Sequence, residues 1–218
     1  SYATIEIDIT EGNREPLPIA ITNFFHDGNV KITNTELPSK IRGVIQNDLE
    51  STGLFNSIDE KAFIQENKSL HLKPRFADWR LINSQGLVTG DLKIEDDRLK
   101  VEFRLWDTLA EKEIEGLVLI TTPDNWRRIS HMIADKIYER LTGEEGYFDT
   151  RIVYVAEEGP KNNRIKKLAI MDQDGANHKF LTSGKELVLT PRFNPVRQEI
   201  TYLSYFKNLP RVYLLNIQ

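Results

Sequence analysis

The distribution of apolar and polar residues predicts two regions with different secondary structure. In the first, residues 4–10 and 98–107 alternate apolar and polar side chains, the period-two pattern of a strand with one buried face. Residues 35–52 and 122–143 instead place apolar side chains at helical spacing. After residue 144 the helical period disappears, and short strands separated by turns replace it. The pattern therefore predicts an α/β region followed by an all-β region.

Two amphipathic helices form one layer of the predicted α/β region. Pro38 is tolerable in the first turn of the first helix, and Gly53 is placed to cap its end. Thr122 and Pro123 supply the N-cap and first helical position of the second helix, which ends at Gly143. The two apolar stripes consist of Ile41, Val44, Ile45 and Leu49, and of Trp126, Ile129, Ile133, Ile137 and Leu141.

Strands supply the other layer. Each helix must bury its stripe on a sheet, so we expect a two-layer α/β domain over residues 1–144, with two main helices on a mixed sheet of about five strands. A short helical piece is expected near residues 74–82. The predicted strands are 4–10, 17–25, 86–94, 98–107 and 111–121.

The second region contains an internal repeat. Ile152–Ala156 and Ile200–Ser204 share one pattern of branched, aromatic and small residues, and Arg164–Ile170 and Arg211–Ile217 recur at nearly the same period. Units of about 40 to 50 residues with several strands are typical of β-propeller blades. We therefore expect residues 145–218 to form an incomplete β-propeller, with the first repeat and the start of the second. Chance similarity between two hairpins is the alternative.

Composition and charge exclude several classes of function. The 218 residues are 39% hydrophobic, but the longest apolar stretch, Leu117–Ile120, is far shorter than the roughly 20 residues that cross a bilayer. The 29 basic and 33 acidic residues give a net charge of −4, and nucleic-acid binding needs clustered Lys and Arg, so it is not expected. The absence of cysteine excludes disulfides, cysteine–zinc sites and thiol catalysis.

The sequence shows no pattern typical of a catalytic, metal or cofactor site. No G-x-S-x-G, phosphate-loop or H-E-x-x-H motif occurs. Asp172–Gly175 is similar to the start of a calcium loop, but its glycine comes too early and no glutamate follows at the twelfth position, so a hairpin turn is the better interpretation. Enzymatic activity is therefore not expected. The histidines lack metal-ligand spacing and are expected to be surface or partly buried residues: His26, His71, His131 and His178.

Three segments carry a resemblance to the TolB family of the Tol-Pal system, and the resemblance covers essentially the whole chain. They are IEIDITEGNREPLPIAI at residues 5–21, IRGVIQNDLESTGLFNSI at 41–58, and DTRIVYVAEE at 149–158. A fourth segment, TPRFNPVRQEITYLSY at 190–205, resembles the family's blade motif Pro-x-Trp-Ser-Pro-Asp-Gly. It departs from the motif at Phe193, Asn194, Val196 and Arg197.

The resemblance implies a non-enzymatic scaffold in the periplasm. TolB-like proteins carry a six-bladed propeller, so we expect this chain, which has no secretory leader, to be a mature and C-terminally truncated fragment. In this family the N-terminal segment binds the inner-membrane protein TolA. The propeller binds the lipoprotein Pal, here mainly through blades beyond residue 218, and is exploited by some colicins. The implied roles are outer-membrane integrity, constriction at cell division, protein transport and colicin import.

The implied TolA-binding segment is the N-terminal arm of this chain. A terminal strand joined by a bend can pair within its own domain or add to the sheet edge of another protein, and the first of these is the alternative. Ile7, Ile9 and Gly12 fit the family segment best, whereas Asp8 stands where an apolar residue is common. The residues implied to bind TolA are Ile5, Glu6, Ile7, Asp8, Ile9, Thr10, Glu11 and Gly12.

Two other functions stay open at this point. The chain is also compatible with the N-terminal part of a propeller hydrolase whose catalytic residues lie beyond Gln218, and a serine elbow there would favour that function. RNA binding is suggested only by the likeness of the layered architecture to anticodon-binding domains, and the acidic balance argues against it. Exposed strand edges of an incomplete propeller also predict self-association.

Overall fold

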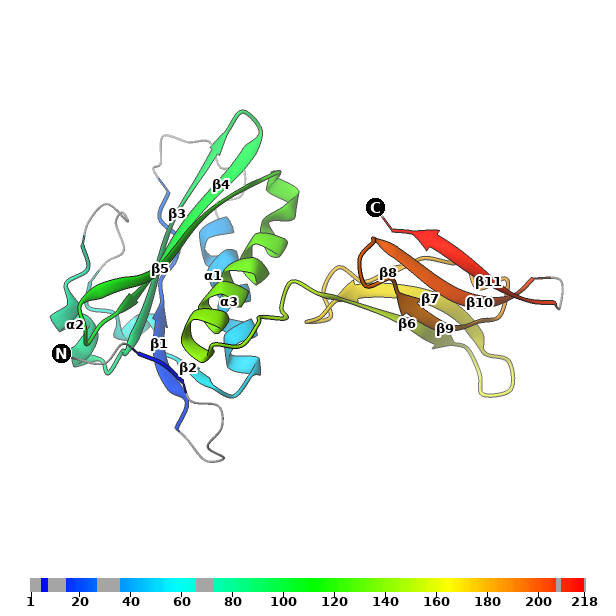
Figure 1. Ribbon diagram of the computed structural model, residues 1–218, viewed down its shortest axis with the longest axis horizontal. Coiled ribbons are helices and arrows are strands. Elements are labelled where there is room, and N and C mark those ends of the chain that lie inside the picture. The colour runs from blue at the N-terminus through cyan, green and yellow to red at the C-terminus, as the bar shows by residue number, and fades with distance from the viewer. Residues whose placement is uncertain (1–4, 8–14, 27–35, 66–72, 207–208, 218) are drawn as a thin grey trace. The chain divides into compact units, whose positions relative to one another are not determined.

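The computed structural model describes residues 5–7, 15–26, 36–65, 73–206 and 209–217. The chain divides into two compact units, Ser1–Asp149 and Thr150–Gln218, which are described separately below (Figure 1). The hydrophobic pattern placed this division just before residue 145. In the structure, the backbone N–H groups of Phe148 and Asp149 donate to the carboxylate of Asp135, so this stretch lies with the first unit.

The first unit contains a mixed five-stranded sheet, as predicted. Its strand order is β2-β1-β3-β4-β5, with β1 parallel to β2 and β3 and the remaining pairs antiparallel. β4 shows the expected alternation, because Leu99, Val101, Phe103 and Leu105 are fully buried. The strands are β1 (Leu17–Ile21), β2 (Phe55–Ser57), β3 (Gly86–Glu95), β4 (Arg98–Asp107) and β5 (Lys112–Thr121).

Helices cover both faces of this sheet (Figure 1). Successive residues of a strand point to opposite faces. Accordingly, Ile19 and Val88 pack with α1 (Leu37–Ser51) and α3 (Trp126–Thr142), whereas Ala20 and Leu87 pack with α2 (Phe76–Leu81). The main core of the domain therefore lies between the sheet and the pair α1 and α3.

The structure corrects the predicted strands at the start of the chain. Ile5–Ile7, the described part of the predicted strand 4–10, belongs to no sheet. The fifth strand is β2, which pairs with β1 and has only three residues, too few to show an alternating pattern. The predicted strand 17–25 ends at Ile21, and Phe25 makes only an isolated bridge to Asp91.

The two predicted main helices are confirmed, with one difference at the start of the second. Pro123–Asn125 forms a 3-10 turn, η2, and α3 begins after it at Trp126. Gly143 ends α3 in the left-handed conformation, with φ of 77°, as its place at the end of the stripe predicts. A second 3-10 turn, η1 (Glu60–Ala62), follows β2.

The second unit is an incomplete propeller made of two antiparallel sheets. A propeller blade has four strands, and each of these sheets has three. Leu168 and Ile170 of the first sheet share one buried cluster with Val188 and Ile200 of the second. The strands are β6 (Arg151–Glu158), β7 (Ile165–Asp172) and β8 (Lys179–Phe180), then β9 (Val188–Phe193), β10 (Glu199–Phe206) and β11 (Leu209–Asn216).

Candidate functional site

The described part of the N-terminal arm is docked on the first unit. The backbone N–H of Ile5 donates to Asp107 Oδ2 at 2.9 Å, and that of Ile7 donates to the carbonyl oxygen of Leu141 at 2.6 Å. The side chain of Ile5 is 9% exposed and joins the main core, while Ile7 packs against that core and Glu6 is exposed. The other predicted TolA-binding residues, Asp8 to Gly12, lie outside the described residues.

Asp107 anchors the arm at the end of β4. Its side chain is buried, and Oδ1 accepts the backbone N–H groups of Leu109 (3.0 Å) and Ala110 (2.8 Å) in the turn that follows. Oδ2 accepts the N–H of Ile5. A buried carboxylate needs such donors to offset its desolvation. One side chain therefore fixes both the turn and the arm.

The second contact of the arm lies at the end of α3. The last carbonyl groups of an α-helix have no partner within the helix. The N–H of Ile7 satisfies that of Leu141, and Gly143 N–H donates to Glu139 O at 2.9 Å. The arm thus acts as a cap for this helix end.

A charged hollow of about 390 Å³ borders the arm. Lys136 forms an ion pair with Glu139 at 2.7 Å, and this hydrogen bond raises the pKa of Lys136 above its usual value. Arg140 Nε donates to the carbonyl oxygen of Ile114 in β5 at 3.0 Å. The lining residues are Glu6, Ile7, Glu115, Lys136, Glu139, Arg140, Leu141, Thr142 and Gly143.

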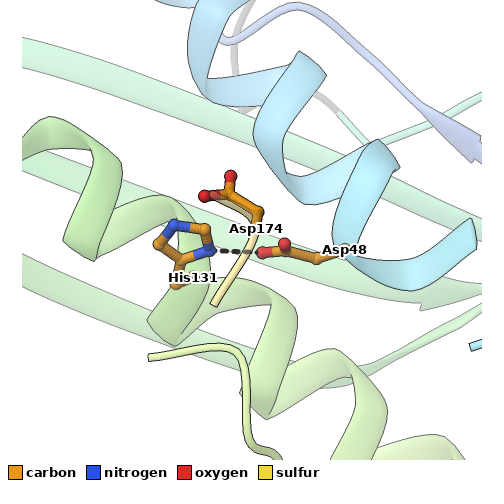
Figure 2. Close-up of side chains that lie close together, drawn as sticks. All are labelled: Asp48, His131 and Asp174. Atoms are coloured by element: carbon orange, nitrogen blue, oxygen red, sulfur yellow. Dashed lines mark hydrogen bonds and ion pairs between the residues drawn. The ribbon is translucent and has the colours of Figure 1, made fainter. Parts of the chain in front are cut away.

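A buried Asp–His pair joins α1 to α3 (Figure 2). Asp48 Oδ2 lies 2.6 Å from His131 Nδ1, and the two side chains are 1% and 3% exposed. The sequence predicted that His131 is a surface or partly buried residue. This prediction is wrong, because the side chain is buried. Because the two residues come from packed helices, the pair fixes the position of one helix against the other.

The sequence itself carries a signal for this pair. Asp48 falls on the same helical face as Ile41 and Ile45, so a carboxylate stands inside an apolar stripe. A buried carboxylate requires a partner. His131 is likewise buried beside Ala134 in the stripe of α3. Polar residues on two facing apolar stripes therefore predict a cross-helix pair.

Asp135 holds the end of the first unit against α3. Its oxygens accept Phe148 N–H at 2.7 Å and Asp149 N–H at 3.1 Å. Burial raises the pKa of Asp135 above its usual value, an effect that these two hydrogen bonds oppose. A Cβ atom at Gly146 would lie 2.5 Å from Asp135 Cα, so only glycine permits this approach.

The segment that is similar to a calcium loop forms a turn of the second unit. Asp172–Gly175 is the predicted hairpin turn, in which Gly175 N–H donates to Asp172 O at 3.0 Å and Gly175 has φ of 86°. Asp174, also labelled in Figure 2, lies in this turn of the second unit. His178 is exposed beside Phe180, and His71 lies outside the described residues.

Comparisons with known proteins find relatives for both parts of the chain. The model of the TolB amino-terminal domain matches residues 5–114, and that of the TolB beta propeller domain matches residues 138–218. The Tol-Pal system protein TolB of Pelagibacter ubique (strain HTCC1062) is 58% identical over 224 residues, covering 100% of this chain and 50% of that protein. The Tol-Pal system protein TolB of Paramagnetospirillum magneticum (strain ATCC 700264 / AMB-1) is 56% identical over 220 residues, covering 100% and 48%.

A solved structure gives the same result. The crystal structure of TolB from Acinetobacter baumannii superposes with a TM-score of 0.77 at 25% identity, covering 98% of this chain and 50% of that one. This chain thus spans about half the length of the curated relatives that it matches. Across the described ranges, no helix has both the length and the apolar character needed to span a membrane.

Proposed function

Because this chain belongs to the TolB family, we propose that it acts in the Tol-Pal envelope system as a non-enzymatic, protein-binding component of the periplasm. The observation that carries the proposal is 58% identity, over the whole chain, to a protein named Tol-Pal system protein TolB. The same similarity gives no support to the alternative that this chain is the N-terminal part of a propeller hydrolase. The proposed cellular roles are outer-membrane integrity and constriction at cell division, with protein transport and colicin import as related activities.

Within this role, the N-terminal arm is the proposed binding site for TolA. A strand that adds to the edge of another sheet needs free backbone N–H and C=O groups. Ile5–Ile7 belongs to no sheet of its own domain. Within the described residues it is held by the hydrogen bonds of two backbone N–H groups, one to the Asp107 carboxylate and one to the carbonyl oxygen of Leu141. In a paired strand, every second side chain points to the same face of the sheet, so Ile5 and Ile7 could both enter apolar pockets of the partner. These features support the exchange of the arm from its own domain to a partner sheet.

Leaving the docked position has a cost that the partner must exceed. Exposing Ile5 costs roughly 1.5–3 kcal/mol, and each lost hydrogen bond about 0.5–1.5 kcal/mol. A strand pairing over residues 5–12 would offer more hydrogen bonds and further isoleucine contacts than the two bonds it replaces. We therefore expect TolA to bind the arm, but with a lower affinity than it would have for an arm that is not docked on its own domain.

The second unit is proposed to contribute to the binding of Pal and of colicins. The sites at the mouth of a propeller are formed by loops from several blades around one axis. This unit has two three-stranded sheets, so it offers only part of such a site. We expect Pal to bind this chain less tightly than it binds the longer relatives.

A truncation tests the TolA site. Removal of residues 1–11 should abolish binding to the C-terminal domain of TolA, measured by calorimetric titration, while the rest of the first unit stays folded by circular dichroism. Lys100→Ala, an exposed change on β4, is the control and should bind as the unchanged chain does. Retained affinity in the truncated chain would place the TolA site elsewhere.

A further inference from the structure

The connections of the first unit leave a crevice at one end of the sheet. β1 and β2 are parallel neighbours. The chain leaves β1 toward α1, which packs on one face of the sheet, and leaves β2 toward α2, which packs on the other face (Figure 1). In open α/β sheets, ligands bind outside the carboxyl ends of strands where the connections diverge in this way.

A pocket of about 580 Å³ lies at this position. Its volume falls within the range of roughly 300–1,000 Å³ that is usual for small-molecule sites. Residues 22–26 follow β1, Glu60 to Gln65 follow β2, and Pro38 comes from the first turn of α1. The lining residues are Thr22, Asn23, Phe24, Phe25, His26, Pro38, Glu60, Lys61, Phe63 and Gln65.

Lys61 gives the pocket its net charge. The carboxylate of Glu60 contacts the guanidinium group of Arg42 and also accepts from Asn23 Nδ2 at 3.5 Å, so its charge is balanced. By contrast, the ammonium group of Lys61 has no ion-pair partner within the ranges that the structure describes. An anion is therefore the complementary ligand, and a cation would be repelled.

Gln65 adds a group for hydrogen bonding. The amide oxygen of Gln65 already accepts from Arg75 N–H at 2.8 Å and from Trp79 Nε1 at 3.1 Å. Its NH₂ group consequently remains available as a donor.

Two aromatic rings supply apolar walls. Phe25 and Phe63 are half-buried, and Phe63 packs edge-on against Trp79 with ring centres 5.0 Å apart. This contact fixes the Phe63 ring, so the wall is formed before any ligand arrives. A ligand with a flat or aliphatic body would gain by covering these rings.

We propose that this pocket binds a small organic carboxylate, with its charged end at Lys61 and its apolar body against Phe25 and Phe63. Glu60 lines the same pocket and disfavours a ligand with several negative charges. The proposal is independent of TolA binding, because the TolA-binding segment that the structure describes, Ile5–Ile7, does not line this pocket.

Nuclear magnetic resonance titration of the full chain with benzoate tests this site. Benzoate should shift the amide signals of residues 22–26 and 60–65 in a saturable way, and benzamide, its uncharged counterpart, should bind about fivefold more weakly. Lys61→Gln should weaken benzoate about fivefold and leave benzamide unchanged. Phe63→Ala should weaken both probes.

Lys93→Gln is the matched control, because Lys93 is an exposed lysine on β3 outside the pocket. It should bind benzoate as the unchanged chain does. Absence of saturable shifts, shifts confined to other residues, or equal benzoate affinity in Lys61→Gln would each overturn the proposal. Because Lys61 is exposed, its substitution preserves the fold, so the result does not depend on the stability of Phe63→Ala.

Discussion

The two units of the chain bury their apolar residues to different extents. In the first, Ile41, Phe103 and Ile133 are fully buried between helices and sheet. In the second, Val212 and Leu214 of β11 are 74% and 63% exposed. Val212 to Leu215 of β11 are four consecutive apolar residues, of which Tyr213 and Leu215 are half-buried and the other two are exposed. β4 instead alternates apolar and polar residues from Arg98 to Leu105 and buries the apolar ones. The first unit therefore covers the apolar face of its strand, whereas the second leaves apolar side chains of β11 exposed.

The difference follows from how each architecture covers its sheets. In the α/β unit, helices of the same unit cover the sheet on both faces. In a propeller, adjacent blades cover the sheet faces, so a unit with few blades leaves them open. The first unit is thus expected to be stable by itself, and the second to depend on further contacts.

The largest effect is expected from breaking the pair that joins α1 to α3. Asp48→Ala removes the buried carboxylate that lies 2.6 Å from His131 Nδ1 and should lower the free energy of unfolding of the first unit by about 3–5 kcal/mol. Trp79, Trp106 and Trp126 all lie in this unit, so urea unfolding followed by tryptophan fluorescence reports on it alone. Asn47→Ala, an exposed neighbour, is the control, and an equal midpoint for both variants would contradict the assigned role.

Matched core substitutions test whether the units unfold independently. Ile133→Ala in α3 and Ile200→Ala in β10 each remove a fully buried side chain, at a cost of about 2–5 kcal/mol. Ile133→Ala should lower the urea midpoint of tryptophan fluorescence. Ile200→Ala should leave that midpoint unchanged and move only the transition seen by circular dichroism. If Ile200→Ala also moved the fluorescence midpoint, the two cores would be coupled.

Open strand faces in the second unit should cause self-association. Leu214→Lys places a charge on the exposed face of β11 and is expected to reduce association at high concentration, with little change in stability. Ile120→Lys makes the same change on β5 of the first unit, where Ile120 is 56% exposed. Sedimentation velocity over a concentration series should separate the two variants. Equal reduction by both would mean that association is not specific to the second unit.

The smallest effect concerns the pH dependence of the first unit. Burial raises the pKa of Asp135, so the folded state binds its proton more tightly than the unfolded state does. Stability contributed by the protonated group is then present at low pH and is lost as the pH rises through the folded pKa. Relative to Asp135→Asn, the unchanged chain should become less stable as the pH rises above the usual pKa of aspartate, about 3.9. A constant difference between the two over this range would contradict the shift.

Local patterns predicted most of the fold. The alternation in β4, the stripes of α1 and α3 and the glycine that ends α3 all depend on neighbours in sequence. The turn at Asp172–Gly175 was predicted for the same reason. β2 was missed because three residues cannot show a period.

The sites depend on contacts between residues distant in sequence. Asp107 and Ile5 meet across 102 positions, and Asp48 and His131 across 83. No local pattern indicates that Asp107 faces the arm. The alternation of residues 4–10 predicted a strand, but it is equally compatible with a docked extended segment, since both bury alternate isoleucines.

Hydrogen exchange at the arm tests the central claim most directly. In the free chain, the amides of Ile5 and Ile7 should show partial protection, because each donates one hydrogen bond to the first unit. With saturating C-terminal domain of TolA, protection should extend over residues 5–12, and Leu109 and Ala110 should exchange faster as Asp107 loses its third donor. Unchanged exchange at Ile5 and Ile7 in the complex, with new protection elsewhere, would contradict TolA binding through the arm.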